Sequence, residues 1–245
     1  MHRVVYILGN MTEQTEQVVI LESVTKSYDG IPILRDVNLS LKAGGRLVLF
    51  GANGSGKTTL IKMLATLIAP SSGFIEINGF ELPTHGVNVR RSIGVLTHQN
   101  LLYDDLTGYE NLRFFGKMFR VPNLDRRIKY LAEMIGVSDK LHARTRTLSH
   151  GMQKRLSLAR ALIHDPSILI MDEPETGLDL EAIEILVDIV NNVRPSLIMT
   201  THNVEFGFRL ADQVGVISGG TIAYQKMRNA VKIEEFKKIL TQYRV

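Results

Sequence analysis

Short apolar runs, separated by amphipathic segments, recur along the chain from residue 18 onward. Four of them are rich in Val, Ile and Leu and occupy residues 18–21, 47–50, 168–171 and 197–199. Runs of this length and composition predict strands that are buried on both faces of a sheet.

Helical periodicity fills two of the intervening segments. Residues 57–68 place one apolar stripe along a predicted helix that stops before Pro70, and residues 149–164 do the same before Pro166. The first stripe consists of Leu60, Ile61, Leu64, Leu67 and Ile68. Strands that alternate with such helices predict an α/β fold with a mostly parallel sheet covered on both faces. Residues 101–147 lack strand-like runs, so we expect a helical insertion within one folding unit.

The two ends of the chain differ from this pattern. Residues 1–17 are expected to be a flexible N-terminal extension, and translation starts at either Met1 or Met11. Residues 233–243 predict a single C-terminal helix, with no appended regulatory domain. The expected organisation is therefore an extension over residues 1–17, one domain over 18–232 and a terminal helix within 233–245.

Composition excludes several classes of protein. The 245 residues include 29 Lys+Arg and 25 Asp+Glu, with 44% hydrophobic and 22% charged residues, which is ordinary for a globular protein. No run approaches the roughly 20 apolar residues of a membrane-spanning helix, and no secretory signal is recognisable, so we expect a cytoplasmic protein. The absence of cysteine excludes disulfides, thiolate catalysis and cysteine-ligated metals. A net charge of +4 is too small to favour nucleic-acid binding.

A glycine-rich segment that follows the run at 47–50 carries the clearest chemistry. It matches the pattern G-x-x-x-x-G-K-[ST] between a predicted strand and a predicted helix. Its residues are Gly51, Ala52, Asn53, Gly54, Ser55, Gly56, Lys57 and Thr58, followed by Thr59. Backbone N–H groups of such a loop face phosphates at a helix N-terminus. Lys57 would bridge the β- and γ-phosphates of ATP, and the Thr58 hydroxyl would hold Mg²⁺; the alternative is an ordinary glycine-rich turn.

Two carboxylates end the apolar run at 168–171. A buried strand that delivers Asp172 and Glu173 at its carboxyl end places them where doubly wound sheets bind ligands. Asp172 is suited to orient Mg²⁺, and Glu173 to polarise an attacking water. The alternative is a strand that exits into solvent at an acidic turn.

Further residues in fixed order resemble the ATP-binding cassette (ABC) family, the ATPase subunits of transporters. Tyr28 resembles the aromatic residue that stacks on adenine, and Gln99 the glutamine that senses Mg²⁺ and water. Residues 148–155 resemble the family signature, residues 176–179 its D-loop, and His202 its switch histidine. The resemblance covers residues 18–225. It implies a P-loop NTPase (RecA-like) parallel-sheet core, a small antiparallel β subdomain and a helical subdomain inserted at about residues 100–160.

The signature segment carries the mechanism that the family implies. Ser149 can cap the following helix, so that its hydroxyl and the N–H of Gly151 face an anion. In the family this end meets the ATP held by a second copy, which makes an ATP-dependent homodimer. His150 and Met152 depart from the commonest Leu-Ser-Gly-Gly-Gln pattern. His150 is either a titratable charge near phosphate or a solvated residue at a helix start.

The transported cargo is suggested only by the resemblance of two sequence segments. Residues 94–116, together with the Ser-His-Gly-Met-Gln signature, resemble the ATPase subunit of the cytochrome c maturation haem exporter and also the wider type-2 exporters of drugs, lipids or polysaccharides. Either resemblance implies an integral-membrane permease partner and a location on the cytoplasmic face of the membrane. The alternatives are a soluble ATPase of the iron–sulfur assembly type and a degenerate module that binds ATP only to regulate. Aromatic residues and a methionine near 114–119 are expected to serve the helical core and the permease contact rather than haem.

Overall fold

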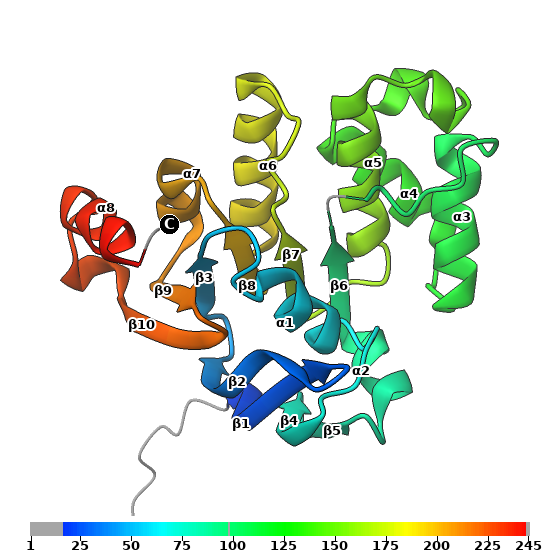
Figure 1. Cartoon of the computed structure of the whole chain (residues 1–245). Coiled ribbons are helices and arrows are strands. Elements are labelled where there is room, and N and C mark those ends of the chain that lie inside the picture. The colour runs from blue at the N-terminus through cyan, green and yellow to red at the C-terminus, as the bar shows by residue number, and fades with distance from the viewer. Residues whose placement is uncertain (1–16, 98, 244–245) are drawn as a thin grey trace, which may run out of the picture.

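The structure is a computed structural model, and it describes residues 17–97 and 99–243. The expected N-terminal extension lies outside this range except for Gln17, which begins the first strand. Two sheets, one mainly parallel and one antiparallel, form the framework, and a group of helices lies beside them (Figure 1).

The larger sheet has six strands, in the order β10-β9-β3-β8-β7-β6. Their bounds are β3 Arg46–Phe50, β6 Ile93–Leu96, β7 Ile168–Asp172, β8 Ser196–Thr201, β9 Gln213–Ser218 and β10 Thr221–Met227. All neighbours are parallel except β10, which runs antiparallel to β9. The runs expected at 47–50, 168–171 and 197–199 are strands of this sheet, buried on both faces as predicted.

The smaller sheet is antiparallel, in the order β2-β1-β4-β5. Its strands are β1 Gln17–Tyr28, β2 Ile31–Lys42, β4 Ser72–Ile77 and β5 Phe80–Leu82. The run at 18–21 lies in β1, where Val19 and Leu21 are buried and their neighbours are half-buried. The prediction that this run is buried on both faces was therefore wrong, because only one face of the small sheet is covered by the core.

Helix α1 (Lys57–Leu64) lies between the two sheets and is shorter than predicted. Thr66 adopts a left-handed backbone conformation with φ of 62°, and the N–H of Leu67 returns to the carbonyl of Lys62 at 2.9 Å. This reverse bond ends the helix at its carboxyl terminus. Leu67 is consequently exposed rather than on the buried stripe. Helix α2 (Gly86–Ser92) follows β5 and leads into β6.

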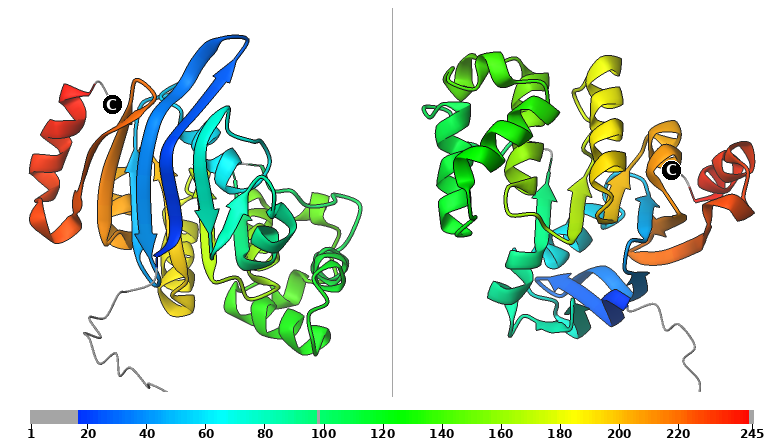
Figure 2. Two further views of the ribbon diagram at one scale, coloured as in Figure 1. Left: turned by 90° about the horizontal axis from the view of Figure 1, so that it is seen from below. Right: turned by 180° about the vertical axis from the view of Figure 1, so that it is seen from behind.

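The segment between β6 and β7 is helical and projects from the sheet beside α6 (Figure 2). It contains α3 (Gly108–Met118), α4 (Leu124–Met134), η1 (Ser138–Lys140), η2 (Thr145–Thr147) and α5 (His150–Leu162). Thr107 and Glu110 form a capping box at the start of α3, with Glu110 N–H 3.1 Å from Thr107 Oγ1. Helix α5 begins as expected, because Ser149 Oγ accepts from the N–H of Met152 at 3.3 Å.

Helices α6 (Leu180–Val193), α7 (Val204–Leu210) and α8 (Ile233–Gln242) complete the covering of the large sheet, with the short η3 (Arg228–Ala230) leading to α8. Phe236 of α8 is buried against Phe50, at 5.0 Å between ring centroids, and against Phe208 of α7 at 5.1 Å. The C-terminal helix thus packs directly behind the last residue of β3. None of the helices within residues 17–97 and 99–243 has the length and apolarity needed to cross a bilayer.

Asn111 holds the helical segment together and offers a test of its packing. Its buried side chain accepts from Tyr103 N–H at 2.8 Å and donates to Tyr103 O and to Thr145 Oγ1 at 3.0 Å each. Asn111→Leu leaves these buried groups unpaired, so we expect the free energy of unfolding to fall by about 2 to 4 kcal/mol. Urea denaturation measures the change, and the exposed Asn88→Leu is the matched control. A fall that is equal in both variants would contradict this role.

Candidate active site

Parallel pairing aligns the carboxyl ends of three central strands at one edge of the large sheet. Phe50 of β3 lies opposite Thr201 of β8, and Asp172 of β7 lies opposite Thr200. The residues that follow, Gly51, His202 and Glu173, therefore begin side by side. Ligands of open α/β sheets bind outside such carboxyl ends.

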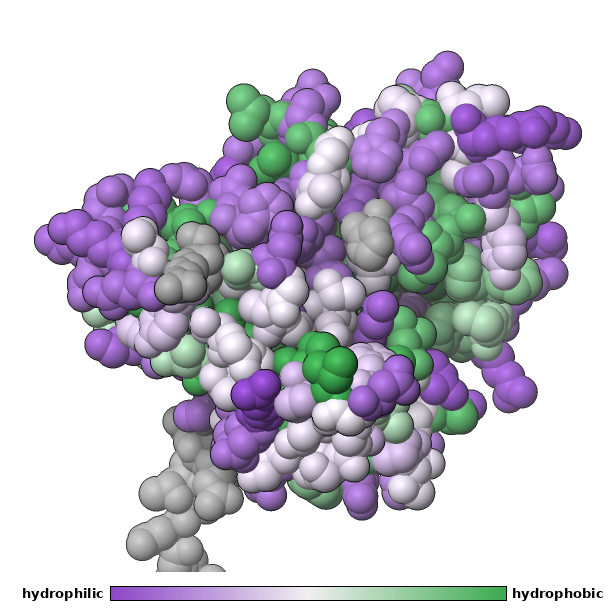
Figure 3. Space-filling view, viewed as in Figure 1, coloured by the Kyte–Doolittle hydropathy of each residue, from purple (hydrophilic) through white to green (hydrophobic). Residues whose placement is uncertain are grey.

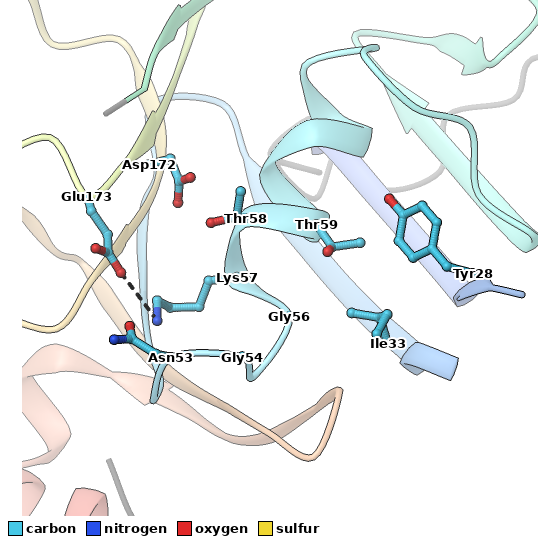
Figure 4. A pocket seen from close by; sticks show the side chains of 10 residues that line it. All are labelled: Tyr28, Ile33, Asn53, Gly54, Gly56, Lys57, Thr58, Thr59, Asp172 and Glu173. Atoms are coloured by element: carbon cyan, nitrogen blue, oxygen red, sulfur yellow. Dashed lines mark ion pairs between the residues drawn. The ribbon is translucent and has the colours of Figure 1, made fainter. Parts of the chain in front are cut away.

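A cavity of about 380 Å³ opens at this edge. Figure 4 shows the residues around it, which come from the loop before α1, from the first turn of α1, from the end of β7 and from β1 and β2. The lining residues are Tyr28, Ile33, Asn53, Gly54, Gly56, Lys57, Thr58, Thr59, Asp172 and Glu173. The phosphate-loop residues and the two carboxylates expected from the sequence thus meet at one cavity, and Tyr28 joins them.

The loop before α1 needs glycine at two positions. Gly56 adopts φ of 108°, a left-handed conformation that other residues rarely adopt. Gly51 has no room for a side chain, because a Cβ there would lie 2.6 Å from the carbonyl oxygen of Ile217. The loop consequently curls over the start of α1 with its backbone close to the cavity, which suits it to hold phosphate.

Lys57 occupies the base of this loop. Its Nζ donates to the carbonyl oxygens of Gly51, at 2.7 Å, and Ala52, at 3.1 Å, and it lies 3.3 Å from Oε1 of Glu173. The ammonium group is almost fully buried, so these three oxygens replace its hydration. Phosphate oxygens entering the cavity would meet a positive charge that is already positioned.

The two carboxylates have different surroundings. Asp172 is buried and accepts a hydrogen bond from Thr200 Oγ1 at 2.6 Å. Glu173 is part-exposed, with its Oε2 3.6 Å from Nδ1 of the exposed His202. A left-handed backbone at Glu173, with φ of 44°, turns the chain sharply where the strand ends. Glu173 therefore lies between the lysine of the phosphate loop and the histidine that follows β8.

Two oxygen donors suited to Mg²⁺ line the cavity. They are the hydroxyl of Thr58, at the start of α1, and the carboxylate of Asp172. Across the described residues, no group of three or more His, Cys, Asp or Glu side chains could hold a metal without further ligands. Mg²⁺ is usually bound by one or two protein oxygens together with substrate phosphates and water, so this donor set fits it.

Two residues predicted by resemblance lie differently with respect to the cavity. Tyr28 forms one wall at the end of β1, and the ammonium of Lys26 lies 5.0 Å from its ring centroid. Gln99 is exposed in the segment after β6 and is not among the lining residues. The adjacent His98 lies outside the described residues.

Ser149 and Gly151 line a second hollow of about 340 Å³, together with His150, Gly177 and Asp179. None of the residues that line the cavity at the phosphate loop lines this second hollow. The exposed ring of His150 packs over Gly177, where an added Cβ would lie 2.9 Å from its Nε2. The histidine that departs from the common signature thus contacts the predicted D-loop of the same chain.

Sequence reasoning did not single out four residues at the site. Ile33 lines the cavity, and Glu175, Thr201 and Lys154 are buried behind it. Burial raises the pKa of the Glu175 carboxyl, and burial lowers the pKa of the Lys154 ammonium. For Glu175 the only signal in the sequence was its position two residues after Glu173. That spacing does not reveal that the Glu175 side chain is buried.

Comparisons with known proteins agree with this geometry. The family model described as "ABC transporter" matches residues 34–176. The ABC transporter ATP-binding protein NatA of Bacillus subtilis is 34% identical over 80% of this chain and 82% of that protein. The Nod factor export ATP-binding protein I of Rhizobium meliloti is 37% identical over 82% of this chain, which spans 61% of that protein.

A solved structure shows the same architecture. The dimeric structure of MJ0796, a bacterial ABC transporter cassette, superimposes with a TM-score of 0.78 at 25% identity, covering 86% of this chain and 98% of that one. The expected P-loop NTPase fold, with its antiparallel subdomain and inserted helices, is confirmed. The matched family model, the relatives and the fold together show that the chain belongs to the ABC transporter family and is an ATP-binding ATPase subunit.

Proposed function

We propose that this chain hydrolyses ATP to power export through a separate integral-membrane permease. One observation carries the proposal: Glu173 lies between Lys57 and His202 at the mouth of the phosphate-loop cavity. A carboxylate in that position can polarise a water molecule that attacks the γ-phosphate.

Each residue then has a distinct task in hydrolysis. Lys57 exchanges its bonds to the loop carbonyls for the β- and γ-phosphate oxygens, and Tyr28 stacks on the adenine ring. Glu173 orients the attacking water and accepts its proton, while His202 holds Glu173 and the γ-phosphate in register. Thr58 and Asp172 would hold Mg²⁺, which would supply positive charge against the phosphates, and Gln99 would reach it only if the segment after β6 moved toward the cavity.

A second copy of the chain completes the site. Ser149 caps helix α5 and Gly151 lies in its first turn, at a hollow apart from the phosphate-loop cavity, which supports a role in binding the γ-phosphate of ATP held by another copy. ATP then joins two copies head to tail, and hydrolysis releases them. This opening and closing is the movement that a permease would convert into transport.

A groove between α2 and α3 is the surface we assign to the permease. It has a volume of about 520 Å³ and is lined by Val87, Arg90, Arg91, Met118, Phe119 and Arg120. Figure 3 shows apolar side chains gathered around α3 on a mostly hydrophilic surface. Apolar contacts rimmed by arginines suit a short permease segment that carries both apolar and acidic side chains. Binding there places the subunit on the cytoplasmic face of the membrane.

The cargo is proposed as a molecule of the kind that type-2 exporters carry, such as a drug, a lipid or a polysaccharide. The similarity to a Nod factor export subunit supports this class. Haem export for cytochrome c maturation is the narrower candidate, favoured by the amino-acid sequence of residues 94–116 and of the signature segment. Neither cargo needs a binding site on this chain, because the permease holds it.

Glu173→Gln tests the hydrolytic proposal. Without the carboxylate no group accepts the proton of the attacking water, so we expect hydrolysis to fall by at least about 100-fold. Because the variant still binds ATP, we expect an ATP-bound dimer to accumulate. Phosphate release and size-exclusion chromatography with ATP measure the two effects. Lys57→Ala is the contrasting variant, in which ATP binding itself weakens because the charge opposite the phosphates is gone. An ATP-loaded Glu173→Gln monomer, or unchanged ATP affinity in Lys57→Ala, would reject the proposal.

Met118→Asp tests the permease surface. The side chain is 58% exposed in the groove, so the change places a charge at the contact without disturbing the core. We expect co-purification with the co-expressed membrane subunit to fall while the ATPase rate of the isolated chain stays unchanged. Met227→Asp, at a methionine on β10 that is 50% exposed, is the control. Equal retention of the permease by both variants would place its contact elsewhere.

ATPase stimulation in the reconstituted complex tests the cargo. The complex with its permease is assayed in lipid vesicles with added haem, and separately with lipid or amphiphilic drug molecules. Stimulation by the lipid and drug panel supports the general exporter. Stimulation by haem alone overturns that choice in favour of haem export.

A further inference from the structure

Glu175 is a buried carboxylate immediately behind the proposed catalytic pair. It lies in the turn that connects β7 to α6, two residues after Glu173, and is 6% exposed. Its Oε1 accepts a hydrogen bond from Thr201 Oγ1. Its Oε2 is buried and finds no hydrogen-bond partner among the described residues. Packing does not require such a group, since an unpaired buried carboxylate oxygen costs free energy.

The partner of Glu175 controls the turn that carries His202. Thr201 is the last residue of β8, fully buried, and its hydroxyl also accepts the N–H of Asn203 at 2.9 Å. Asn203 in turn caps α7 by accepting from Phe206 N–H at 3.0 Å. The Thr201 hydroxyl therefore links the residue before His202 to the N–H of the residue after it. Because this hydroxyl donates to Glu175, the carboxylate sets its orientation.

The charges around Glu175 belong to the same site. Its pKa is raised by burial and by the nearby charge of Glu173, against the hydrogen bond from Thr201 and the attraction of His202. Lys154 of α5, only 2% exposed, donates to the carbonyl of Thr97 at 2.8 Å, and Glu175 and Asp172 both favour its charged form. Groups with such perturbed proton affinity cluster at functional sites.

We propose that Glu175 is a positioning residue of the ATPase site, which holds His202 in place against Glu173 through the Thr201 hydroxyl. The hydrogen bond from Thr201 restrains the turn because Glu175 supplies an accepting oxygen in a water-excluded place, and an amide oxygen in the same position can accept that bond too. The inference rests on the proposed function, in which Glu173 and His202 act on the attacking water.

Three variants test this role. Glu175→Leu removes the acceptor, Thr201→Val removes the donor with little change of shape, and Glu175→Gln keeps an oxygen that can accept from Thr201. Misplacing a catalytic group commonly costs about 10- to 100-fold, so we expect kcat to fall by that factor in the first two variants. The KM for ATP stays unchanged, and Glu175→Gln retains most of the activity. The double variant of Glu175→Leu with Thr201→Val is no slower than either single variant.

The decisive measurement repeats Glu175→Leu in a His202→Ala background. If Glu175 acts through His202, the residual rate, followed by single-turnover release of labelled phosphate, does not fall further. An equal fold-loss in both backgrounds would overturn the inference and indicate a general structural role. The exposed Asp188→Leu on α6 is the control for loss of a carboxylate elsewhere on the chain.

A readout that does not depend on hydrolysis separates this inference from the proposed function. The imidazole NMR signal of His202, identified by its loss in His202→Ala, shifts in Glu175→Leu and stays near its original position in Glu175→Gln. An unmoved signal in Glu175→Leu would overturn the positioning role even if the ATPase assignment holds. If Lys57→Ala and Glu173→Gln behave as the parent while the histidine signal shifts, the proposed function fails and the contact stands.

Discussion

Parallel pairing of β3, β8 and β7 is the constraint on which the site depends. Because the three strands run in register, the residues beyond Phe50, Thr201 and Asp172 emerge at one edge of the sheet. Their burial on both faces gives each strand a fixed position, so the loops that follow inherit that position. The phosphate loop, the turn that carries His202 and the turn that carries Glu173 are far apart in the chain, and strand pairing and burial bring them together.

Charges at this edge are arranged in layers of increasing burial. Glu173 lines the cavity and pairs with the exposed His202, and Lys57 lies between the loop carbonyls and Glu173. Asp172, which also lines the cavity, and the buried Glu175 accept from the hydroxyls of two successive threonines of β8. Low-dielectric surroundings strengthen such contacts and make an unpaired member costly. The outer groups can therefore change partners while the inner groups hold the backbone.

The inserted helices carry the two surfaces that we propose for a second copy and for a permease. Helix α5 presents its N-terminus in one hollow, suited to a second copy, and its buried Lys154 reaches the segment after β6. The groove beside α3 lies on the same helical segment, next to Arg90 and Arg91 of α2. A movement of the helical segment relative to the large sheet would thus reach both of these proposed contacts.

The sequence by itself determined the central strands, the phosphate loop, the carboxylates at the end of β7 and the cap of α5, because these depend on local apolar pattern, glycine spacing and capping chemistry. Two predictions from the sequence were wrong. The run at 18–21 is buried on one face only, because apolar residues alone do not reveal which face of a sheet is covered. Helix α1 ends before Leu67 and Ile68, because the apolar pattern does not reveal that a left-handed residue ends the helix. The burial and contacts of Glu175, Thr201 and Lys154 were decided only by the tertiary structure. Their contacts join β7, β8 and α5 across long stretches of chain, and burial of a charge depends on everything that packs around it.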